Sequence, residues 1–284
     1  MKIAVLSGKG GTGKTLVSVN LAAVAGNCDY IDCDVEEPNG RLFFKPEKIT
    51  RKDVTTEIPV VNHDQCIGCK KCVEFCKFNA LAYINKVMVF ENICHSCGGC
   101  MLVCPENAIT KKEKVVGQIE MGKSLDVNVF SGVLNPGEPS GTPIIAALLG
   151  DTKDNSRDII IDCPPGSSCT VMDSIRDADY CVLVAEPTIF GAHNLNMVYE
   201  LVTLFKKPFG VVLNKTSDGI NPSEEFCREN HIKIIGNITF NSHLGTLNSN
   251  SLIIAREDMH YKSLFESLLQ SITKEVNFET VTNS

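Results

Sequence analysis

Short runs of apolar residues recur along the chain, and segments with helical spacing separate them. The runs are continuous in valine, isoleucine and leucine rather than alternating with polar residues, which is typical of strands buried on both faces of a parallel sheet. We expect strands at residues 3–6, 30–31, 158–161, 181–185, 210–213 and 232–238, and helices at residues 14–25, 192–205, 223–230 and 261–276. This alternation predicts an α/β domain with a doubly wound, mostly parallel sheet.

A cysteine-rich region interrupts this alternation. Two similar segments begin at Cys66 and Cys94, so they repeat at an offset of 28 residues (94 − 66). No long strand or helix fits between the cysteines. We therefore predict a small inserted α+β module at residues 60–112, which divides the main domain into a first part, residues 1–59, and a second part, residues 113–284.

Two further segments each allow two interpretations. The turn-rich stretch from Ser131 to Thr142 is either a plain connecting loop, which we favour, or a loop that faces a partner. The helical pattern at residues 261–276 places apolar residues on one stripe, but its polar positions mix lysines with glutamates. We therefore expect a helix docked on the core rather than a membrane anchor.

Composition limits the partners and the cellular compartment that we expect for the protein. The 284 residues are 43% hydrophobic, which is ample for a buried core, and the formal net charge of −7 gives no reason to expect a nucleic-acid or anionic-membrane partner. We find no apolar segment long enough for a signal-peptide core or a membrane span. Eight of the 14 cysteines lie between Cys66 and Cys104, which indicates metal binding in a reducing cytosol, so we expect a cytoplasmic protein.

A glycine-rich loop follows the first expected strand and precedes the first expected helix. Its sequence, GKGGTGKT, satisfies the pattern G-x-x-x-x-G-K-[ST] of phosphate-binding loops in the required strand–loop–helix context. Glycines let consecutive backbone N–H groups point at phosphate oxygens, the lysine neutralises the β- and γ-phosphates, and the last hydroxyl ligates Mg²⁺. We therefore predict that Lys14 is catalytic, that Thr15 ligates Mg²⁺, and that the nucleotide is bound by Gly8, Lys9, Gly10, Gly11, Thr12, Gly13, Lys14 and Thr15.

The additional lysine of this loop, Lys9, gives it the form KGGTGKT, which resembles the deviant Walker A motif of the MinD/ParA/nitrogenase-iron-protein class of ATPases. In that class the extra lysine reaches the partner's phosphates in a nucleotide-sandwich dimer. The resemblance implies that Lys9 is catalytic and that the chain forms a homodimer when ATP is bound; a solvated surface lysine is the alternative. The segment YIDCDVEEPN resembles the first switch of the class, which implies that Asp34 orients the attacking water and that Asp32 lies near Mg²⁺.

Two later segments resemble further motifs of the same class. The strand that ends at Asp162 resembles a Walker B motif, and the CPPG that follows resembles the second switch. The resemblance implies that Asp162 holds Mg²⁺ through water and that Gly166 donates its N–H to the γ-phosphate. Asn214 begins a segment that resembles the adenine-contacting end, and Ser217 replaces the aspartate of the guanine-reading pattern Asn-Lys-x-Asp, which favours ATP over GTP.

The two cysteine-rich segments share one spacing. Each has the form C-x2-C-x2-C-x3-C of bacterial ferredoxins, in which the fourth cysteine ligates the other cluster. Soft thiolates suit iron–sulfur clusters, and the short spacing wraps backbone N–H groups towards the cluster sulfides. Zinc sites and disulfides are the competing interpretations, and the doubled ferredoxin spacing disfavours both. We predict two [4Fe–4S] clusters, one held by Cys66, Cys69, Cys72 and Cys104 and the other by Cys94, Cys97, Cys100 and Cys76.

Six cysteines lie outside these runs. Cys28, Cys33 and Cys181 fall in or beside apolar segments, so we expect them to pack in the core. Cys169 follows Asp162 by seven residues (169 − 162), an offset similar to that of the cysteine through which the nitrogenase iron protein holds a cluster across its dimer interface. The resemblance leaves open whether Cys169 has a bridging role.

The chain as a whole resembles MinD-superfamily P-loop ATPases that contain an inserted two-cluster ferredoxin domain, and it is similar to Mrp-type and nitrogenase-iron-protein-like ATPases. The resemblance implies Mg²⁺-dependent ATP hydrolysis and an ATP-driven dimer cycle that serves metallocluster assembly or delivery. ATP-gated electron transfer to a redox enzyme is the close alternative, and a spatial regulator of the MinD/ParA type is a third. The first two require a metalloprotein or redox partner that the sequence does not identify.

Overall fold

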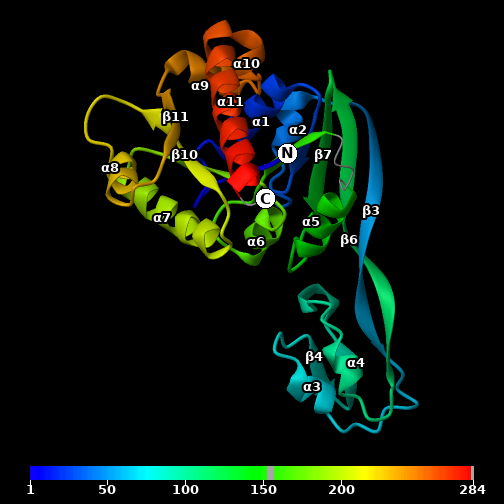
Figure 1. Ribbon diagram of the computed structural model, residues 1–284. Coiled ribbons are helices and arrows are strands. Elements are labelled where there is room, and N and C mark those ends of the chain that lie inside the picture. The colour runs from blue at the N-terminus through cyan, green and yellow to red at the C-terminus, as the bar shows by residue number, and fades with distance from the viewer. Residues whose placement is uncertain (152–156, 283–284) are drawn as a thin grey trace.

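Nine strands of the described residues form a single sheet at the centre of the main body (Figure 1). The structure is a computed structural model, and it describes residues 1–151 and 157–282. The strands, including those of a separate hairpin, are β1 (Lys2–Leu6), β2 (Cys28–Asp32), β3 (Glu47–Val61), β4 (Leu81–Ile84), β5 (Lys86–Val89), β6 (Ile109–Ser124), β7 (Val127–Leu134), β8 (Asp158–Asp162), β9 (Tyr180–Ala185), β10 (Phe209–Thr216) and β11 (Ile234–Thr239).

Helices precede or follow most of these strands. They are α1 (Lys14–Ala25), α2 (Gly40–Phe44), α3 (Lys71–Phe75), the 3-10 helix η1 (Glu91–Ile93), α4 (Gly99–Leu102), α5 (Thr142–Asp151), α6 (Cys169–Ile175), α7 (Ile189–Leu204), α8 (Pro222–Glu229), α9 (Ser242–Ser249), α10 (Ile254–Glu257) and α11 (Met259–Thr282).

Parallel pairing dominates the sheet. The strand order is β11-β10-β9-β1-β8-β2-β7-β6-β3, and only the pairs of β6 with β7 and with β3 are antiparallel. Helices cover both faces, so the predicted doubly wound, mostly parallel α/β fold is confirmed. Because β1 lies between β8 and β9, the carboxyl ends of these three strands meet at one edge. Ligands bind at that edge in open α/β sheets.

Two apolar layers enclose the sheet. On one face, α5 to α8 cover a layer that includes Leu6, Ile31 and Leu183. On the other face, α1, α10 and α11 cover a layer that includes Val5 and Tyr30. Successive residues of a strand point to opposite faces, so a strand with two buried faces must be apolar throughout. This packing explains the continuous apolar runs in the sequence.

The last long helix, α11, docks on the second layer, as expected. Its buried side chains recur at helical spacing and are Tyr261, Phe265, Leu268 and Ile272. Among the described residues we find no helix with the length and apolar character needed to cross a membrane.

The two antiparallel edge strands continue beyond the sheet as a long ribbon. β3 and β6 pair almost along their whole length, and the ribbon carries residues 62–108 at its far end (Figure 1). There the β4–β5 hairpin, α3 and α4 surround a small apolar cluster that is separate from the two layers of the main sheet. We call residues 62–108 the cysteine module.

Three sequence predictions about elements need correction. Residues 131–134 are the end of β7 and not part of a loop. β11 begins at Ile234, two residues later than predicted. The ribbon includes residues 60–61 and 109–112, which we had placed in a segment without long strands. β3 escaped prediction because most of its side chains are exposed on both faces, so no buried face forces an apolar pattern.

Candidate functional site

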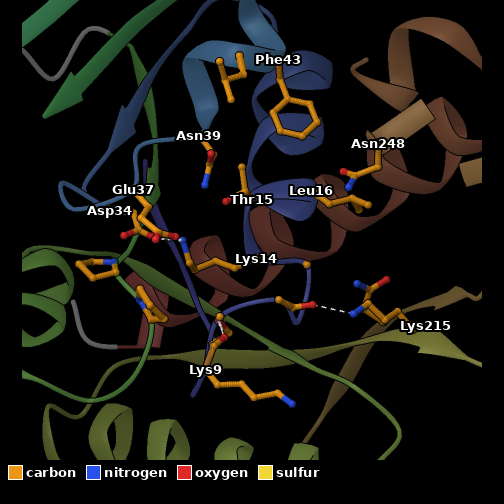
Figure 2. Close-up of a pocket in the computed structure, with 18 of the residues that line it drawn as sticks. Lys9, Lys14, Thr15, Leu16, Asp34, Glu37, Asn39, Phe43, Lys215 and Asn248 are labelled. Atoms are coloured by element: carbon orange, nitrogen blue, oxygen red, sulfur yellow. Dashed lines mark hydrogen bonds and ion pairs between the residues drawn. The ribbon is translucent and has the colours of Figure 1, made fainter. Parts of the chain in front are cut away.

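The phosphate loop turns between β1 and α1 beside a cavity of about 840 Å³ (Figure 2). Gly13 has a φ of 98°, and a Cβ there would lie 2.0 Å from Nδ2 of Asn214, so only glycine fits. Asn214, in β10, donates from Nδ2 to the carbonyl of Thr12 (2.7 Å). The neighbouring Lys215 donates to the carbonyl of Gly11 (2.6 Å). β10 thus fixes the loop from the side while the start of α1 borders the cavity.

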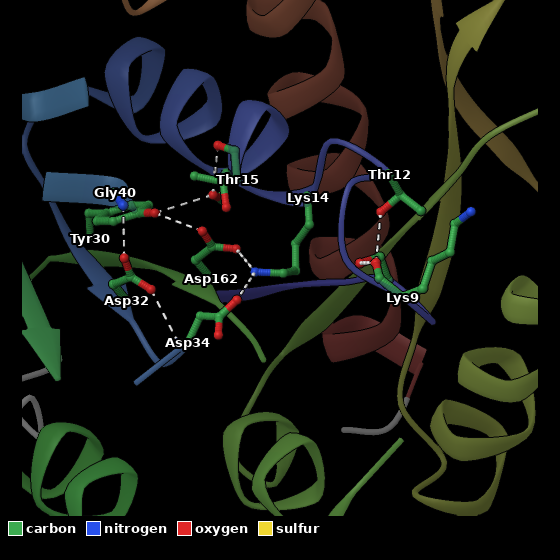
Figure 3. Close-up of polar contacts among 11 residues, drawn as sticks. Lys9, Thr12, Lys14, Thr15, Tyr30, Asp32, Asp34, Gly40 and Asp162 are labelled. Carbon is green, nitrogen blue, oxygen red and sulfur yellow. Dashed lines mark hydrogen bonds and ion pairs between the residues drawn. The ribbon is translucent and has the colours of Figure 1, made fainter. Parts of the chain in front are cut away.

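Lys14 lies at the centre of a buried charged network (Figure 3). Its Nζ donates to Oδ1 of Asp162 (2.7 Å) and lies 3.6 Å from Oδ2 of Asp34. Burial alone would lower the pKa of Lys14, but the charges of Asp162 and Asp34 raise it above its ordinary value. Lys14 therefore stays charged and offsets part of the negative charge of the two carboxylates.

Tyr30 and Asp32 complete this network from β2. The Tyr30 hydroxyl donates to Oδ2 of Asp162 (2.9 Å), while the Asp32 carboxylate accepts from the backbone N–H groups of Asp34 (3.2 Å) and Gly40 (2.8 Å). Burial, together with the charge of Asp162, raises the pKa of Asp32 to about 8. Gly40 packs against the ring of Tyr30, where a Cβ would lie 2.3 Å from a ring carbon. Asp32 thus anchors the first switch and α2, whereas Asp34 lines the cavity.

Lys9 is held within its own chain. Its Nζ lies 2.5 Å from Oε1 of Glu186, which follows β9, and Nζ of Lys215 lies 3.6 Å from the other carboxylate oxygen. Burial would raise the pKa of Glu186, but the hydrogen bonds and charges of the two lysines lower it below its ordinary value. The side chain of Lys9 is 42% exposed. Its predicted reach to a partner's phosphates requires this ion pair to open.

Most of the predicted nucleotide-binding residues converge on the one cavity. Those that line it are Lys9, Gly10, Gly11, Gly13, Lys14, Thr15, Asp34 and Asn214. In Figure 2, Lys14 and Asp34 point toward one another across the space between the loop and the first switch. Five do not line the cavity: Gly8, Thr12, Asp32 and Asp162, which are buried, and Gly166, which is partly exposed.

Two residues with predicted roles in nucleotide binding make other hydrogen bonds in this conformation. The N–H of Gly166 donates to the carbonyl of Ser7 (2.9 Å), so a bond to a γ-phosphate requires the second switch to move. Nδ2 of Asn214 is committed to the phosphate loop, which leaves its Oδ1 for an adenine base. Both roles stay predictions.

Three features of the site were missed by the sequence reasoning. We had treated Tyr30 as an ordinary strand residue. The cavity is also lined by Phe240, which precedes α9, and by Asn248 in α9, a helix that we did not predict. Glu186 had a usable signal, because it directly follows the buried strand β9. Asp162 similarly ends β8, and Asp34 comes two residues after β2. Its partner Lys9 is distant in sequence, so no local spacing links the two.

Four predicted cluster ligands surround one cavity in the cysteine module. Cys66, Cys69, Cys72 and Cys104 line it, together with apolar residues of the module. Burial and the charges of Cys104 and Cys66 raise the pKa of Cys72. The N–H of Ala108 donates to Sγ of Cys104 (3.3 Å). These are the four cysteines that the ferredoxin spacing assigns to one cluster, so the donor set fits a [4Fe–4S] group.

In the second set, Cys94 and Cys97 lie near Cys100. This residue is buried, and burial together with the charges of Cys94 and Cys97 raises its pKa. Over residues 1–151 and 157–282, no group of three or more His, Cys, Asp or Glu side chains is gathered as a site for a metal ion. A [4Fe–4S] cluster binds each thiolate at a different iron, so its ligands surround a volume rather than a point.

The backbone of the module repeats with its sequence. Left-handed backbone recurs at an offset of 28 residues in the pairs Gly68 and Ser96, Lys70 and Gly98, and Asn79 and Asn107. The hydrogen bonds of Asn62 N–H to the Ala108 carbonyl and of Phe90 N–H to the Ala80 carbonyl, both 2.8 Å, follow the same offset. The third cysteine of each run lies in a short helix, α3 or α4. The duplicated sequence therefore forms a duplicated structure.

The cysteines outside the module fall into two groups. Cys28, Cys33 and Cys181 are fully buried, which confirms the expected core packing, and Cys163 and Cys227 are buried as well. Cys169 is exposed at the start of α6. Its exposure is compatible with both interpretations of its role.

Comparison with known proteins finds a family and several relatives. The chain matches the CobQ/CobB/MinD/ParA nucleotide binding domain over residues 3–253. An uncharacterised protein of Methanocaldococcus jannaschii is 30% identical over 282 residues, which cover 96% of this chain and 98% of the relative. An iron-sulfur cluster carrier protein of Pyrococcus horikoshii is 27% identical over 232 residues, which cover 78% of this chain and 63% of that protein.

Solved structures share the fold at low sequence identity. The cell division ATPase MinD of Pyrococcus furiosus superposes with a TM-score of 0.60 at 20% identity, covering 96% of this chain and 98% of that chain. The septum site-determining protein MinD of Pyrococcus horikoshii, complexed with Mg-ADP, gives a TM-score of 0.61 at 16% identity, covering 98% and 97%.

Proposed function

Because the chain belongs to the CobQ/CobB/MinD/ParA family of nucleotide-binding proteins, we propose that it is a Mg²⁺-dependent ATPase that carries two [4Fe–4S] clusters and acts in metallocluster assembly or delivery. One observation carries the proposal: a single chain combines a phosphate loop in a charged network with a cavity that four ferredoxin-spaced cysteines line. The similarity to proteins named iron-sulfur cluster carriers supports the assembly role.

In the proposed reaction, Lys14 exchanges its two carboxylate partners for the β- and γ-phosphates of ATP. This exchange frees Asp162 to hold the Mg²⁺ of the substrate through water, with the Thr15 hydroxyl as a direct ligand. Asp34, at the cavity wall, orients the attacking water. Lys9 leaves Glu186 and reaches the phosphates bound to a second copy, so ATP closes a homodimer. Hydrolysis then removes the γ-phosphate and lets the dimer open.

In the cysteine module, different residues would have different roles toward the two clusters. The cysteine thiolates would ligate the iron, the apolar side chains of Val87 and Ile109 would exclude water, and the N–H of Ala108 would stabilise the charge on Sγ of Cys104. A [4Fe–4S] cluster, when bound, supplies one-electron redox chemistry and a store of iron and sulfide. Cys69 and Cys97 are exposed, so each cluster would have one edge near the surface.

That exposure also favours the second candidate function, ATP-gated electron transfer to a redox enzyme. One experiment separates the two. The chain is loaded with radioactive iron under anaerobic conditions and incubated with Mg-ATP and an apoprotein that accepts a [4Fe–4S] cluster. We expect iron to move to the acceptor with wild type and with the surface control Lys262→Ala, but not with Lys14→Ala. Iron that stays on the chain while electrons pass to the acceptor during ATP turnover contradicts the assembly role and supports the alternative.

A further inference from the structure

The ribbon leaves the main sheet at a fixed bend. Two consecutive residues of β3 pair with Gly117 and Val115, which leaves Val116 of β6 as an extra residue. Such a bulge bends its strand and increases the local twist. The carbonyl of Val116 accepts a hydrogen bond from the N–H of Asn135 (2.9 Å), which lies between β7 and α5. The bend that aims the ribbon is therefore tied to residues 134–141, which we call the docking segment.

A lysine just beyond the bulge joins the cysteine module to the same docking segment. Nζ of Lys114 lies 2.8 Å from Oε1 of Glu138, and it also donates to the carbonyl of Glu91 (3.2 Å) and to Oδ1 of Asn92 (3.4 Å). The side chains of Lys114 and Glu138 are 16% and 9% exposed. Solvent therefore weakens this ion pair less than the neighbouring pair of Lys112 and Glu91, whose side chains are 50% and 43% exposed.

The docking segment is bound at both ends to the first switch. The N–H of Leu134 donates to the carbonyl of Val35 (2.9 Å). At the other end, Gly141 approaches Val35 so closely that a Cβ would lie 2.3 Å from its side chain. Val35 directly follows Asp34, whose carboxylate lies 3.6 Å from Nζ of Lys14. A change in the partners of Asp34 therefore acts next to the residue that holds the docking segment.

We propose that Lys114 and Glu138 are positioning residues, whose ion pair seats the cysteine module on the nucleotide-binding body and passes the state of the first switch to the module. The contacts form an unbroken series from Lys14 through Asp34 to the docking segment and Lys114. They end at η1, which closes one residue before Cys94. The link to ATP rests on the proposed function, whereas the seating of the module does not.

Hydrogen exchange of the full chain, measured by mass spectrometry on peptides that cover residues 88–97, tests both parts. Lys114→Gln keeps most of the stem but removes the ammonium group. Without nucleotide, we expect exchange in this variant to be at least about tenfold faster than in wild type, because a partly buried charged contact is lost. Glu138→Gln should behave in the same way, and Lys114→Arg should retain most of the protection. Lys112→Gln, which removes only an exposed ion pair, is the matched control and should match wild type.

A second comparison on the same samples uses ADP and a non-hydrolysable ATP analogue. Wild type and Lys112→Gln should differ between the two nucleotides in residues 88–97, and Lys114→Gln should lose that difference while hydrolysing ATP at the wild-type rate. Unchanged nucleotide-free exchange in Lys114→Gln overturns the positioning role. If exchange in wild type does not differ between the two nucleotides, or if Lys114→Gln keeps the difference, the link to the switch is overturned. If wild type does not hydrolyse ATP, the proposed function is wrong. The comparison without nucleotide still tests the positioning role in that case.

Discussion

The phosphate-loop edge of the sheet and the cysteine module satisfy their polar groups in opposite ways. At the sheet edge, three separate segments contribute Lys14 from α1, Asp162 from β8, and Tyr30 and Asp34 from β2 and the residues after it, and these side chains pair with one another inside the protein. The module is one contiguous segment, residues 62–108, and the largest part of its small core is made of cysteines and their immediate neighbours. The polar groups of the sheet edge therefore pair within the protein, whereas the small core of the module includes its thiols. Under the proposed function, that core would depend on the clusters that the thiols bind.

This difference predicts two levels of stability in one chain. The body buries two apolar layers on a nine-stranded sheet, whereas the small cluster at the module has five buried members, namely Cys72, Leu81, Val87 and Cys100 of the module and Ile109 at the start of β6. A core of that size cannot offset the chain entropy of the segment by itself, and small domains commonly use metal binding to do so. Changes at the sheet edge should act on the reaction, and changes in the module should act on its folding.

The largest expected effect is on catalysis. Lys14→Ala removes the cation that neutralises the phosphates, and we expect ATP hydrolysis to fall at least about a hundredfold, the scale of losing a charged group that stabilises a transition state. Iron content should stay at the wild-type level, because the module makes no use of Lys14. Phosphate release and iron content are measured on the same preparation, with Lys262→Ala as the control. A parallel loss of iron would contradict the separation of the two regions.

The next effect concerns the module. Cys72→Ser removes a buried thiolate, and we expect it to lower the iron content by about half, since one of two clusters loses a ligand. Limited proteolysis within residues 62–108 should become about tenfold faster, while the unfolding temperature of the body stays nearly unchanged. Cys227→Ser, a buried cysteine of α8, is the matched control and should leave iron content and proteolysis unchanged. Equal effects of the two substitutions would mean that cluster binding does not hold the module together.

A smaller effect is expected at the wall of the charged network. Tyr30→Phe removes one hydrogen bond to Asp162 without changing the ring that packs on Gly40. The loss of about 1 kcal/mol corresponds to roughly a fivefold rise in the Mg²⁺ concentration needed for half-maximal hydrolysis. Tyr180→Phe, which removes an equally buried hydroxyl that contacts Glu275, should leave the Mg²⁺ dependence unchanged. No difference between the two variants would exclude a positioning role for Tyr30.

An effect of the same size, on stability rather than on the reaction, is expected where the body meets the root of the ribbon. Glu120 of β6 accepts hydrogen bonds from Arg41 of α2 (2.5 Å) and Arg51 of β3 (2.9 Å). Burial would raise the pKa of Glu120, but these arginines lower it below its ordinary value of 4.5. A lowered pKa means that the stabilisation is present above 4.5 and is lost as the pH falls through the folded-state value.

We therefore expect wild type to be more stable than Glu120→Gln by about 1 kcal/mol at pH 7, with the advantage declining below about pH 4.5. Urea unfolding of both proteins across this range measures the difference. Lys111→Gln removes an exposed ion pair with Glu57 and serves as the control, with a difference near zero. An advantage that grows as the pH falls would contradict the assigned sign.

The sequence predicted six of the nine strands of the sheet, β1, β2 and β8 to β11, and the phosphate loop, because both leave local signals. Strands with two buried faces must be continuously apolar, as in Ile3–Leu6, and the loop must place glycines and a lysine at fixed spacing. The ribbon left no such signal, since side chains exposed on both faces are free to vary. Contacts such as Lys9 with Glu186 and Lys114 with Glu138 were also out of reach, because their partners meet only after the strands have paired.

The most direct test of the central claim is native mass spectrometry of the anaerobically purified full chain, before and after addition of Mg²⁺ and a non-hydrolysable ATP analogue. The account predicts the mass of one chain plus two [4Fe–4S] clusters, about eight iron and eight sulfide ions, and conversion to a dimer with one nucleotide per chain. A chain that carries zinc in place of iron and sulfide, or that binds no nucleotide while its clusters are intact, would contradict it.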